Sequence, residues 1–530
     1  MTGFLYMPER AYPLLLVALV TLTHAPALDS GFHYDDRHSL LDNPHIRDLG
    51  QIPRFFYDPT AFSADPAYAM YRPLVLTAHA VNFALAGYAP LGYQLLNLAI
   101  HCLATLAVYL LLLCWPLAPI AALAGALLFG LHPVQTEAVN YISSRSESLA
   151  ALFYLLSLYS YLRQQQTLSL LSFGAALLCK ATAITLPAAL VVHSWLFGDR
   201  SLKRLWAYGL VALAYIALYT GLSAPGAGIE RAAEVRPPLS QVATQAKALV
   251  HYVQLVAMPV DLNIQQQFFV SASPLAPVPL LCLLAVGSLA VCARRPSTSS
   301  YALFFFVLAL APTLFIPLHI LVNDHRPYLA LFGLALALGA ACQRLRSTHI
   351  VLLCLLLASL SLQRGQIWRS ELALWHDAAR RAPLMPEAHY NHGYALHRVA
   401  DLDGALAAYK RAIALEPDYA RAHSNLGAIY QQRQQLYQAV GAYRAALARE
   451  PDAVETLNNL GLCYAGLGQT DQALEFYQRA LTLDANQAEV WLNLGLLLRD
   501  RGESQAAAQA LERALQLDPS IAERFPAPGK

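Results

Sequence analysis

The sequence predicts an all-α protein in two parts: a polytopic transmembrane helical domain over residues 1–365 and a helical repeat domain over residues 366–530. Hydrophobic residues make up 57% of the chain and charged residues 13%, whereas soluble domains average about 45–50% and about 25%. Apolar runs fill the first part, and a pattern with a period of 34 residues fills the second. A single soluble globular domain is therefore excluded.

Apolar runs near the length that a membrane helix needs, about 20 residues, mark about eleven spans. Ala25-Pro26-Ala27 loosely imitates a signal-peptidase site, but we expect the first span to be retained. One helix over 167–197 would be about 46 Å long, well beyond the bilayer core, so we expect a hairpin turning near Lys180. The candidate spans are 11–28, 91–115, 117–132, 147–163, 167–180, 181–197, 204–222, 275–293, 301–318, 326–341 and 348–364.

Basic residues beside the spans orient the domain, because loops rich in Lys and Arg stay in the cytoplasm. All of them fall on that side if residues 242–272 do not cross and form a re-entrant or surface helix instead. Residues 29–90, residues 132–148 and the repeats then lie outside. The basic residues are Arg10, Arg163, Arg200, Lys203, Arg204, Arg294, Arg295, Arg344 and Arg346.

Charge and cysteine content limit the partners and the compartment. The formal net charge of +2 does not favour a nucleic-acid partner. Seven of the eight cysteines lie in or beside apolar runs, which is typical of small apolar fillers rather than a disulfide framework. The chain has no N-x-[ST] glycosylation acceptor, which favours a bacterial setting. The outside would then be the periplasmic face of a bacterial inner membrane.

The C-terminal part repeats four positions every 34 residues, which is the tetratricopeptide pattern of paired helices. Small residues let the paired helices approach closely, and a proline ends each second helix. We expect repeats near 387–417, 421–451, 455–485 and 489–519, preceded by a half-repeat helix at 369–382, with a concave surface that suits a peptide. The recurring residues are Pro383, Pro417, Pro451 and Pro519, with Ala485 in the missing slot; Asn391, Asn425, Asn459 and Asn493; Gly393, Gly427, Gly461 and Gly495; and Ala412, Ala446, Ala480 and Ala514.

The first outside segment carries adjacent carboxylates, Asp35 and Asp36, just beyond the first span. A carboxylate pair can act as a general base or hold a divalent cation, and it can equally cap a helix. Arg72 follows in the same segment. Its guanidinium suits a phosphate group, or it faces anionic lipid headgroups.

The second outside segment places a polar stripe at helical spacing, formed by Glu137, Asn140, Ser144 and Glu147. Such a stripe entering a membrane helix is expected to face a wet cavity, the alternative being hydrogen bonds between helices. His132 and Arg145 lie in the same segment, and we predict that both contribute to a substrate site.

Two single cations complete the set of candidate residues. Lys180 lies in the predicted outside turn, where a lysine is commonly an anchor at the membrane surface. Arg326 begins a later span in VNDHRPYL, with Asp324 and His325 before it and Tyr328 after it. We predict that Lys180, Arg326 and Tyr328 belong to the substrate site, on the same membrane face as the carboxylates.

Several stretches together carry a family resemblance. They are FHYDDRHSLLDNPHI, YRPLVLTAHAVNFALAGYAPLGYQLLNLAIH, GLHPVQTEAVNYISSRSESLA, the lysine of CKATAITLP, and HRPYL. The chain resembles the transmembrane-and-tetratricopeptide-repeat O-mannosyltransferases and their bacterial relatives, of the GT-C glycosyltransferase superfamily. It departs from them at Ala181, where relatives often have glutamate, and at His325, where many have glutamate before the arginine.

The resemblance implies a GT-C-type membrane domain and an inverting transfer from a polyprenyl-phosphate sugar. Asp35 or Asp36 would be the catalytic base, and Glu137 would orient acceptor or donor. Arg72, Arg145, Lys180 and Arg326 would face the phosphate. A need for a divalent cation is left open by the family, whose members differ in this.

The leading hypothesis is therefore a membrane glycosyltransferase that transfers a sugar, a mannose by resemblance, to a hydroxyl of a protein acceptor presented by the repeats. Two alternatives are a transferase that acts on a glycan or lipid, and a non-catalytic membrane scaffold that displays the repeats to envelope proteins. The scaffold would tolerate neutral substitutions in the carboxylate loops, whereas the enzyme would not.

Overall fold

The protein is all-helical in the computed structural model, which describes residues 8–65, 68–198, 204–222, 235–292, 295–316 and 320–524. The regular elements in these ranges are helices, without a strand among them, as the sequence predicts. The chain divides into two compact units, Met1–Leu374 and Trp375–Lys530. The boundary falls within helix α16, Glu371–Arg381.

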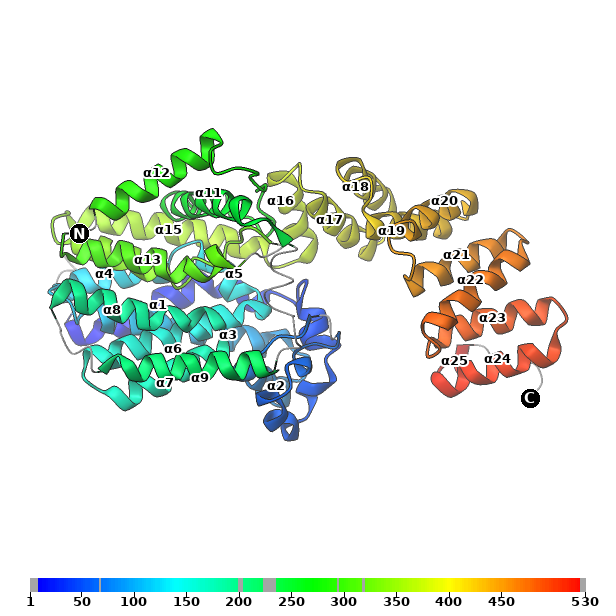
Figure 1. Ribbon diagram of the computed structural model, residues 1–530, viewed down its shortest axis with the longest axis horizontal. Helices are drawn as coiled ribbons and strands as arrows, with labels where there is room; N and C mark the ends of the chain where they lie inside the picture. Colours follow the sequence, from blue (N-terminus) through cyan, green and yellow to red (C-terminus); the bar gives the residue numbers. More distant parts are fainter. Residues whose placement is uncertain are drawn as a thin grey trace. The chain divides into compact units, whose positions relative to one another are not determined.

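The first unit is a bundle in which helices far apart in sequence run side by side (Figure 1). Residues 25–62 form short 3₁₀ and π turns rather than long helices. The long helices of this unit are α1 (Tyr12–His24), α2 (Pro73–Ala86), α3 (Pro90–Leu112), α4 (Pro119–Gly130), α6 (Arg145–Leu162), α7 (Gln166–Cys179), α8 (Leu186–Phe197), α9 (Trp206–Leu222), α11 (Pro238–Ala257), α12 (Pro277–Cys292), α13 (Thr298–Phe315), α14 (Leu331–Cys342) and α15 (Ser347–Ile367).

Three helical stretches among the described residues are long and apolar enough to cross a membrane: Glu9–Asp29, Pro90–Leu112 and Ser347–Ile367. The other predicted spans correspond to shorter apolar helices or, for α6, to a more polar one, so the count of about eleven stays a prediction. The predicted set omitted α2, a 14-residue helix that is also apolar. Arg200, Lys203, Arg294 and the ends of two predicted spans, 293 and 317–318, lie outside the described residues.

Small residues allow the bundle helices to pack closely. A β-carbon on Gly125 of α4 would lie 2.6 Å from the carbonyl oxygen of Ala335 in α14, and Gly339 of α14 lies beside the same glycine. Close approach through small residues is typical of helix packing in membranes. The hydrophobic effect does not drive helices together in lipid, so close van der Waals contact does. The close contact therefore holds α4 against α14, and α4 leads into the second outside segment.

The helical run over residues 167–197 is broken at Lys180, as predicted. Helix α7 ends at Cys179, Lys180 has an extended backbone with φ −160° and ψ 131°, and a 3₁₀ turn over Ala181–Thr185 leads into α8. Residues 242–272 do not form one element: α11 ends at Ala257, and the chain from 258 to 275 is irregular. That irregular stretch contributes to the site described below.

The second unit is a series of antiparallel helix pairs (Figure 1). At the four recurring glycines, an added β-carbon would lie 2.6–2.8 Å from a side chain of the paired helix: Tyr409, Tyr443, Tyr477 or Leu511. The predicted close approach at these positions is thus confirmed. The pairs are α17 (Pro386–Arg398) with α18 (Leu402–Leu415), α19 (Ala420–Gln432) with α20 (Leu436–Leu447), α21 (Val454–Gly466) with α22 (Thr470–Leu483), and α23 (Ala488–Asp500) with α24 (Ser504–Leu517), followed by α25 (Ile521–Arg524).

Candidate functional site

The two adjacent aspartates of the first outside segment have different surroundings. Asp36 is fully buried and accepts three hydrogen bonds: from the backbone N–H of His33 (2.9 Å), from the backbone N–H of Ser143 (2.8 Å) and from the Ser143 hydroxyl (2.5 Å). The side chain of Asp35 is 44% exposed. Asp36 therefore joins the first outside segment to the second, while the Asp35 carboxylate faces solvent.

A strained turn and a buried amide hold this segment in place. Tyr34, immediately before Asp35, has φ +43°, a left-handed conformation that costs a bulky residue roughly 1–2 kcal/mol. The side-chain amide of buried Asn43 donates to the carbonyl oxygens of Ser39, Ala61 and Phe62 at 3.1–3.2 Å. Strain of this kind persists where the surrounding structure fixes it, and it clusters at functional sites.

The continuous polar stripe predicted for the second segment is wrong. The short helix α5 (Gln135–Asn140) ends before Tyr141, whose backbone is extended, and a 3₁₀ turn over Ile142–Ser144 precedes α6. The break arises because residues 141–143 bind the first segment: the backbone N–H of Asp35 donates to the Tyr141 hydroxyl at 3.0 Å, and Ser143 binds Asp36. Glu137 and Glu147 consequently lie on separate helices.

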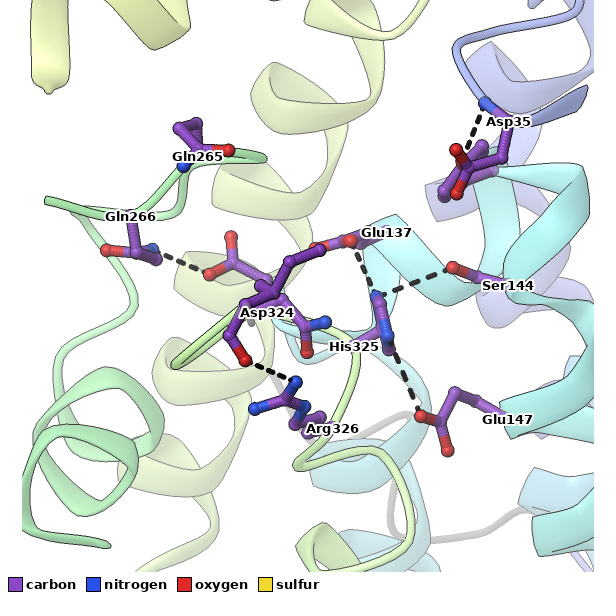
Figure 2. A network of polar contacts seen from close by, with 12 residues as sticks. Asp35, Glu137, Ser144, Glu147, Gln265, Gln266, Asp324, His325 and Arg326 are labelled. Atoms are coloured by element: carbon purple, nitrogen blue, oxygen red, sulfur yellow. Dashed lines mark hydrogen bonds and ion pairs between the residues drawn. The ribbon is translucent and has the colours of Figure 1, made fainter. Parts of the chain in front are cut away.

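His325 nevertheless brings the two glutamates together (Figure 2). Its Nδ1 lies 2.7 Å from Oε1 of Glu137, and its Nε2 lies 3.7 Å from Oε1 of Glu147. Lys180, at the end of α7, forms an ion pair with Glu147. Exposed fractions of these four side chains are between 5% and 18%. The cluster is thus a nearly buried set of two carboxylates, an imidazole and an ammonium group.

Burial shifts the pKa values of the site residues that lie outside the membrane helices. It raises the pKa of Glu137, to which the charge of Glu147 adds, and it raises the pKa of Asp324, to which the charge of Glu137 adds. Burial also lowers the pKa of His325, against the opposing effect of Glu147. Burial therefore moves the pKa of Glu137 and of Asp324 toward neutrality, where a carboxyl can exchange protons with a substrate, and it keeps His325 neutral.

Asp324 connects this cluster to the irregular stretch after α11. Its carboxylate accepts from the backbone N–H of Asn263 and from Nε2 of Gln266, both at 2.7 Å, as Figure 2 shows for Gln266. Asp324 and His325 stand beside Arg326 in the sequence, but they were not predicted to belong to the site. The rarity of buried charge beside a membrane span could have selected them, whereas nothing in the sequence marks Gln266.

Two predicted cations lie around the cluster. Nη1 of Arg72 donates to the Ser146 hydroxyl at 3.1 Å. Burial lowers the pKa of Arg72, while Glu147 and, more weakly, Asp35 raise it, so this arginine links the Asp35 side of the site to the Glu147 side. Arg326 donates to the backbone carbonyls of Leu321 and Ile320 at 2.7 and 2.8 Å, and its charge also acts on Lys180.

The structure does not bring the other three predicted residues into this cluster. Arg145 is buried and donates to Oδ1 of Asn97 at 2.7 Å and to the carbonyl of Tyr93 at 3.0 Å. His132 contacts the carbonyl of Val256 at 2.9 Å. The hydroxyl of Tyr328 lies 2.7 Å from Nδ1 of His101, and Nε2 of the same histidine contacts the carbonyl of Gly130 at the end of α4. These contacts connect the helices that carry the site.

The side chains of the described residues were compared with the groupings that metal ions need. Within the ranges that the structure describes, no group of three or more His, Cys, Asp and Glu side chains is arranged to hold a metal ion. The carboxylates that are close together are bridged by His325 or bound to backbone N–H groups, as described above.

Comparison with known proteins shows similarity to protein O-mannosyl-transferases, over up to 77% of the chain. Protein O-mannosyl-transferase Tmtc1 of Drosophila melanogaster is 34% identical over 178 residues, which cover 32% of this chain and 21% of that protein. Protein O-mannosyl-transferase F38B6.6 of Caenorhabditis elegans is 24% identical over 439 residues, which cover 77% and 63%. The chain is a homologue of the protein O-mannosyl-transferases. Matches to these relatives span between about a fifth and two thirds of their length.

Another relative matches a similar share of the chain, and family models match its C-terminal part. Mouse protein O-mannosyl-transferase TMTC3 is 24% identical over 472 residues, or 76% of this chain and 51% of that protein. Family models described as TPR repeat and tetratricopeptide repeat match residues 401–434, 418–486 and 452–520. Residues 401–520 of this O-mannosyl-transferase homologue are therefore tetratricopeptide repeats.

Solved structures are similar to about a third of the chain. A crystal structure of MamA is 19% identical and covers 30% of this chain and 94% of that one, with a TM-score of 0.28. YrrB, described as a TPR protein with an unusual peptide-binding site, is 19% identical over 32% of this chain and 88% of its own, with a TM-score of 0.27.

Proposed function

We propose that this protein is a membrane glycosyltransferase that moves a sugar, a mannose by analogy with its relatives, from a polyprenyl-phosphate donor to a hydroxyl of a protein acceptor. Its relatives carry the name protein O-mannosyl-transferase. One observation carries the proposal: the half-exposed carboxylate of Asp35 lies at a site that also holds buried carboxylates and cations. This combination suits proton removal from an acceptor beside a charged leaving group.

Asp35 is the general base of the proposed reaction. It takes the proton of the acceptor hydroxyl, the hydroxyl oxygen bonds to the anomeric carbon, and the bond between that carbon and the phosphate oxygen breaks with its electrons going to the phosphate. Asp36 suits this role less, because its carboxylate already accepts three hydrogen bonds and is fully buried. We assign Asp36 to holding the two outside segments together.

The cations Arg72, Lys180 and Arg326 stabilise the phosphate as negative charge develops on it. Glu147 holds Lys180 in place, and the Glu137–His325 pair orients the donor sugar or the acceptor. His132, Arg145 and Tyr328 contribute indirectly, because their partners are backbone and side-chain groups of the bundle. Binding of a divalent cation is not required by this scheme.

The site and the repeats share the extracytoplasmic side of a bacterial inner membrane in this proposal. The positive-inside distribution of Arg and Lys beside the apolar helices supports that orientation. A tetratricopeptide array offers a surface on which a protein acceptor is held while its Ser or Thr hydroxyl reaches the site. The repeats therefore select the acceptor, and the membrane domain carries out the transfer.

Sugar transfer by purified full-length protein tests the proposal. The assay uses detergent-solubilised protein, polyprenyl-phosphate mannose and an extract of periplasmic proteins as acceptor. Asp35→Asn is expected to reduce transfer at least about 100-fold, the usual contribution of a general base. Asp42→Asn is the matched control, since Asp42 is an exposed aspartate of the same segment, paired with Arg37, and it should transfer at the wild-type rate.

Three results would contradict parts of the proposal. Normal transfer by a well-folded Asp35→Asn variant rules out Asp35 as the base. Transferred sugar found on glycan or lipid, and not on protein, would show that the acceptor is a glycan or lipid. No transfer by wild-type protein with any of several polyprenyl-phosphate sugars would favour the non-catalytic scaffold.

A further inference from the structure

His38 lies beside the proposed base. One helical turn separates the two residues, and Nε2 of His38 is 3.5 Å from Oδ1 of Asp35. The His38 side chain is 24% exposed, while its Nε2 atom is itself buried. Among the described residues, Nε2 of His38 is paired with the carboxylate of Asp35.

Two contacts from residues 63 and 68 fix the orientation of the His38 ring. Its Nδ1 lies 2.9 Å from the hydroxyl of buried Ser63. The ring also stacks on Tyr68, with 4.5 Å between centroids and 20° between planes. A ring held on one edge and one face cannot turn away from Asp35 without losing both contacts, so the imidazole is preorganised.

The hydrogen bonds of Ser63 favour one tautomer of the His38 ring. The Ser63 hydroxyl oxygen accepts from the backbone N–H of Asp65 at 3.0 Å. Its proton has two acceptors within reach, Nδ1 of His38 at 2.9 Å and the His38 carbonyl oxygen at 3.5 Å, and the shorter contact favours Nδ1. A neutral imidazole that accepts at Nδ1 carries its proton on Nε2. Nε2 lies 3.5 Å from Oδ1 of Asp35 and makes no hydrogen bond among the described residues.

We propose that His38 is a positioning residue, which holds the Asp35 carboxylate through an Nε2–H donor so that the other carboxylate oxygen meets the acceptor hydroxyl. The inference rests on the proposed function. The acceptor proton moves to Asp35 and none moves to His38. The distance of 3.5 Å is long for a hydrogen bond, and catalytic contacts commonly shorten when substrate binds.

Steady-state transfer by full-length variants tests the role. His38→Ala is expected to lower kcat about 10–100-fold, the effect of losing exact orientation, with KM for polyprenyl-phosphate mannose unchanged. His38→Gln retains an N–H donor and should recover part of the loss, and added imidazole should rescue His38→Ala. His45→Ala is the matched control, since this histidine of the same segment contacts Arg54 rather than an aspartate.

Two results overturn the inference while leaving the proposed function intact. One is a wild-type kcat in His38→Ala. The other is an equal loss in His38→Ala and His38→Gln without imidazole rescue, which indicates a structural role only. The pairing is also measurable without turnover, by NMR of ¹⁵N-labelled histidine: Asp35→Asn should shift the His38 Nε2 resonance, and an unchanged resonance overturns the pairing. Failure of wild-type transfer, in contrast, contradicts the proposed function.

Discussion

Asp35 and Asp36 are neighbours in sequence, but their environments give them different chemistry. The Asp36 carboxylate is fully buried and bound by His33 and Ser143, whereas the Asp35 side chain is 44% exposed and lies beside His38. Substitution of each residue should therefore affect a different property. We expect Asp35→Asn to reduce sugar transfer and Asp36→Asn to reduce stability, since an amide cannot accept on both sides as the carboxylate does.

The buried Asp36 also predicts a pH dependence of stability. Burial raises its pKa to about 7, against the hydrogen bonds from His33 and Ser143, which lower it. A carboxyl whose pKa is raised by folding stabilises the native state at low pH, and this contribution is lost as pH rises through the folded-state value. Between about pH 4 and 7, the window set by the ordinary aspartate pKa of 3.8 and the raised pKa of Asp36, native stability should therefore decrease as pH rises.

Thermal unfolding of the detergent-solubilised protein over that pH range checks this. Asp36→Asn should unfold at a lower temperature at low pH and show a smaller change with pH than the wild type. Glu137 and Asp324, whose pKa values are also raised, keep part of the dependence in both proteins. An identical pH slope in wild type and variant would show that Asp36 does not titrate in this window.

At the scale of helices, local sequence patterns predicted the features that depend on residues near in sequence. They missed a helix break that depends on a contact between distant residues. Span length predicted the break near Lys180, and the 34-residue register predicted the close approach at Gly393 and Gly461. Both features are present. The break at Tyr141 depends on Asp36, more than a hundred residues earlier. Because that contact is long-range, the helical spacing of Glu137 and Glu147 pointed to a continuous stripe that does not form.

The repeat helices give a prediction on packing. A β-carbon at Gly461 of α21 would lie 2.6 Å from the Tyr477 ring of α22, whereas one at Gly441 of α20 would meet no atom within 4 Å. Gly461→Ala should destabilise its repeat by about 1–3 kcal/mol through overpacking. Gly441→Ala, the matched control in an exposed helix interior, should stabilise by about 0.5–1 kcal/mol.

Hydrogen exchange of the full-length protein, followed by mass spectrometry, measures both effects locally. Gly461→Ala should speed exchange in α21 and α22, and Gly441→Ala should slow it in α20. Unchanged protection in α21 and α22 would mean that the Tyr477 ring moves aside without cost.

Across the whole molecule, composition and repeats predicted the helical class and the tetratricopeptide array, but not how the site is assembled. Asp35, Glu137 and Lys180 were selected because charge beside membrane helices is costly. His325, which bridges Glu137 and Glu147, stood in the same motif as Arg326 but was not assigned. Gln266 binds Asp324 from an irregular stretch, and no periodic pattern marks such a residue. Contacts between loops that are distant in sequence therefore could not be predicted from local patterns.

The proposed orientation predicts which parts of the chain are accessible from outside the cell membrane. If the proposed function is correct, the carboxylate segment and the repeats lie on the same side, since an acceptor held by the repeats must reach Asp35. Cysteine substitutions at exposed Asp42, Ser504 and Arg344 sample the first segment, the last repeat and a predicted cytoplasmic loop. The exposed Cys114 is replaced by Ser in all three variants to remove its background labelling.

A membrane-impermeant maleimide applied to cells with a permeable outer membrane is expected to label Asp42→Cys and Ser504→Cys. Arg344→Cys should react only after the inner membrane is disrupted, because basic loops stay in the cytoplasm. Labelling of Asp42→Cys but not of Ser504→Cys would place an odd number of crossings between them. Acceptor presentation by the repeats would then be impossible, and the repeats would have to bind a cytoplasmic partner while the transferase site works on the other side.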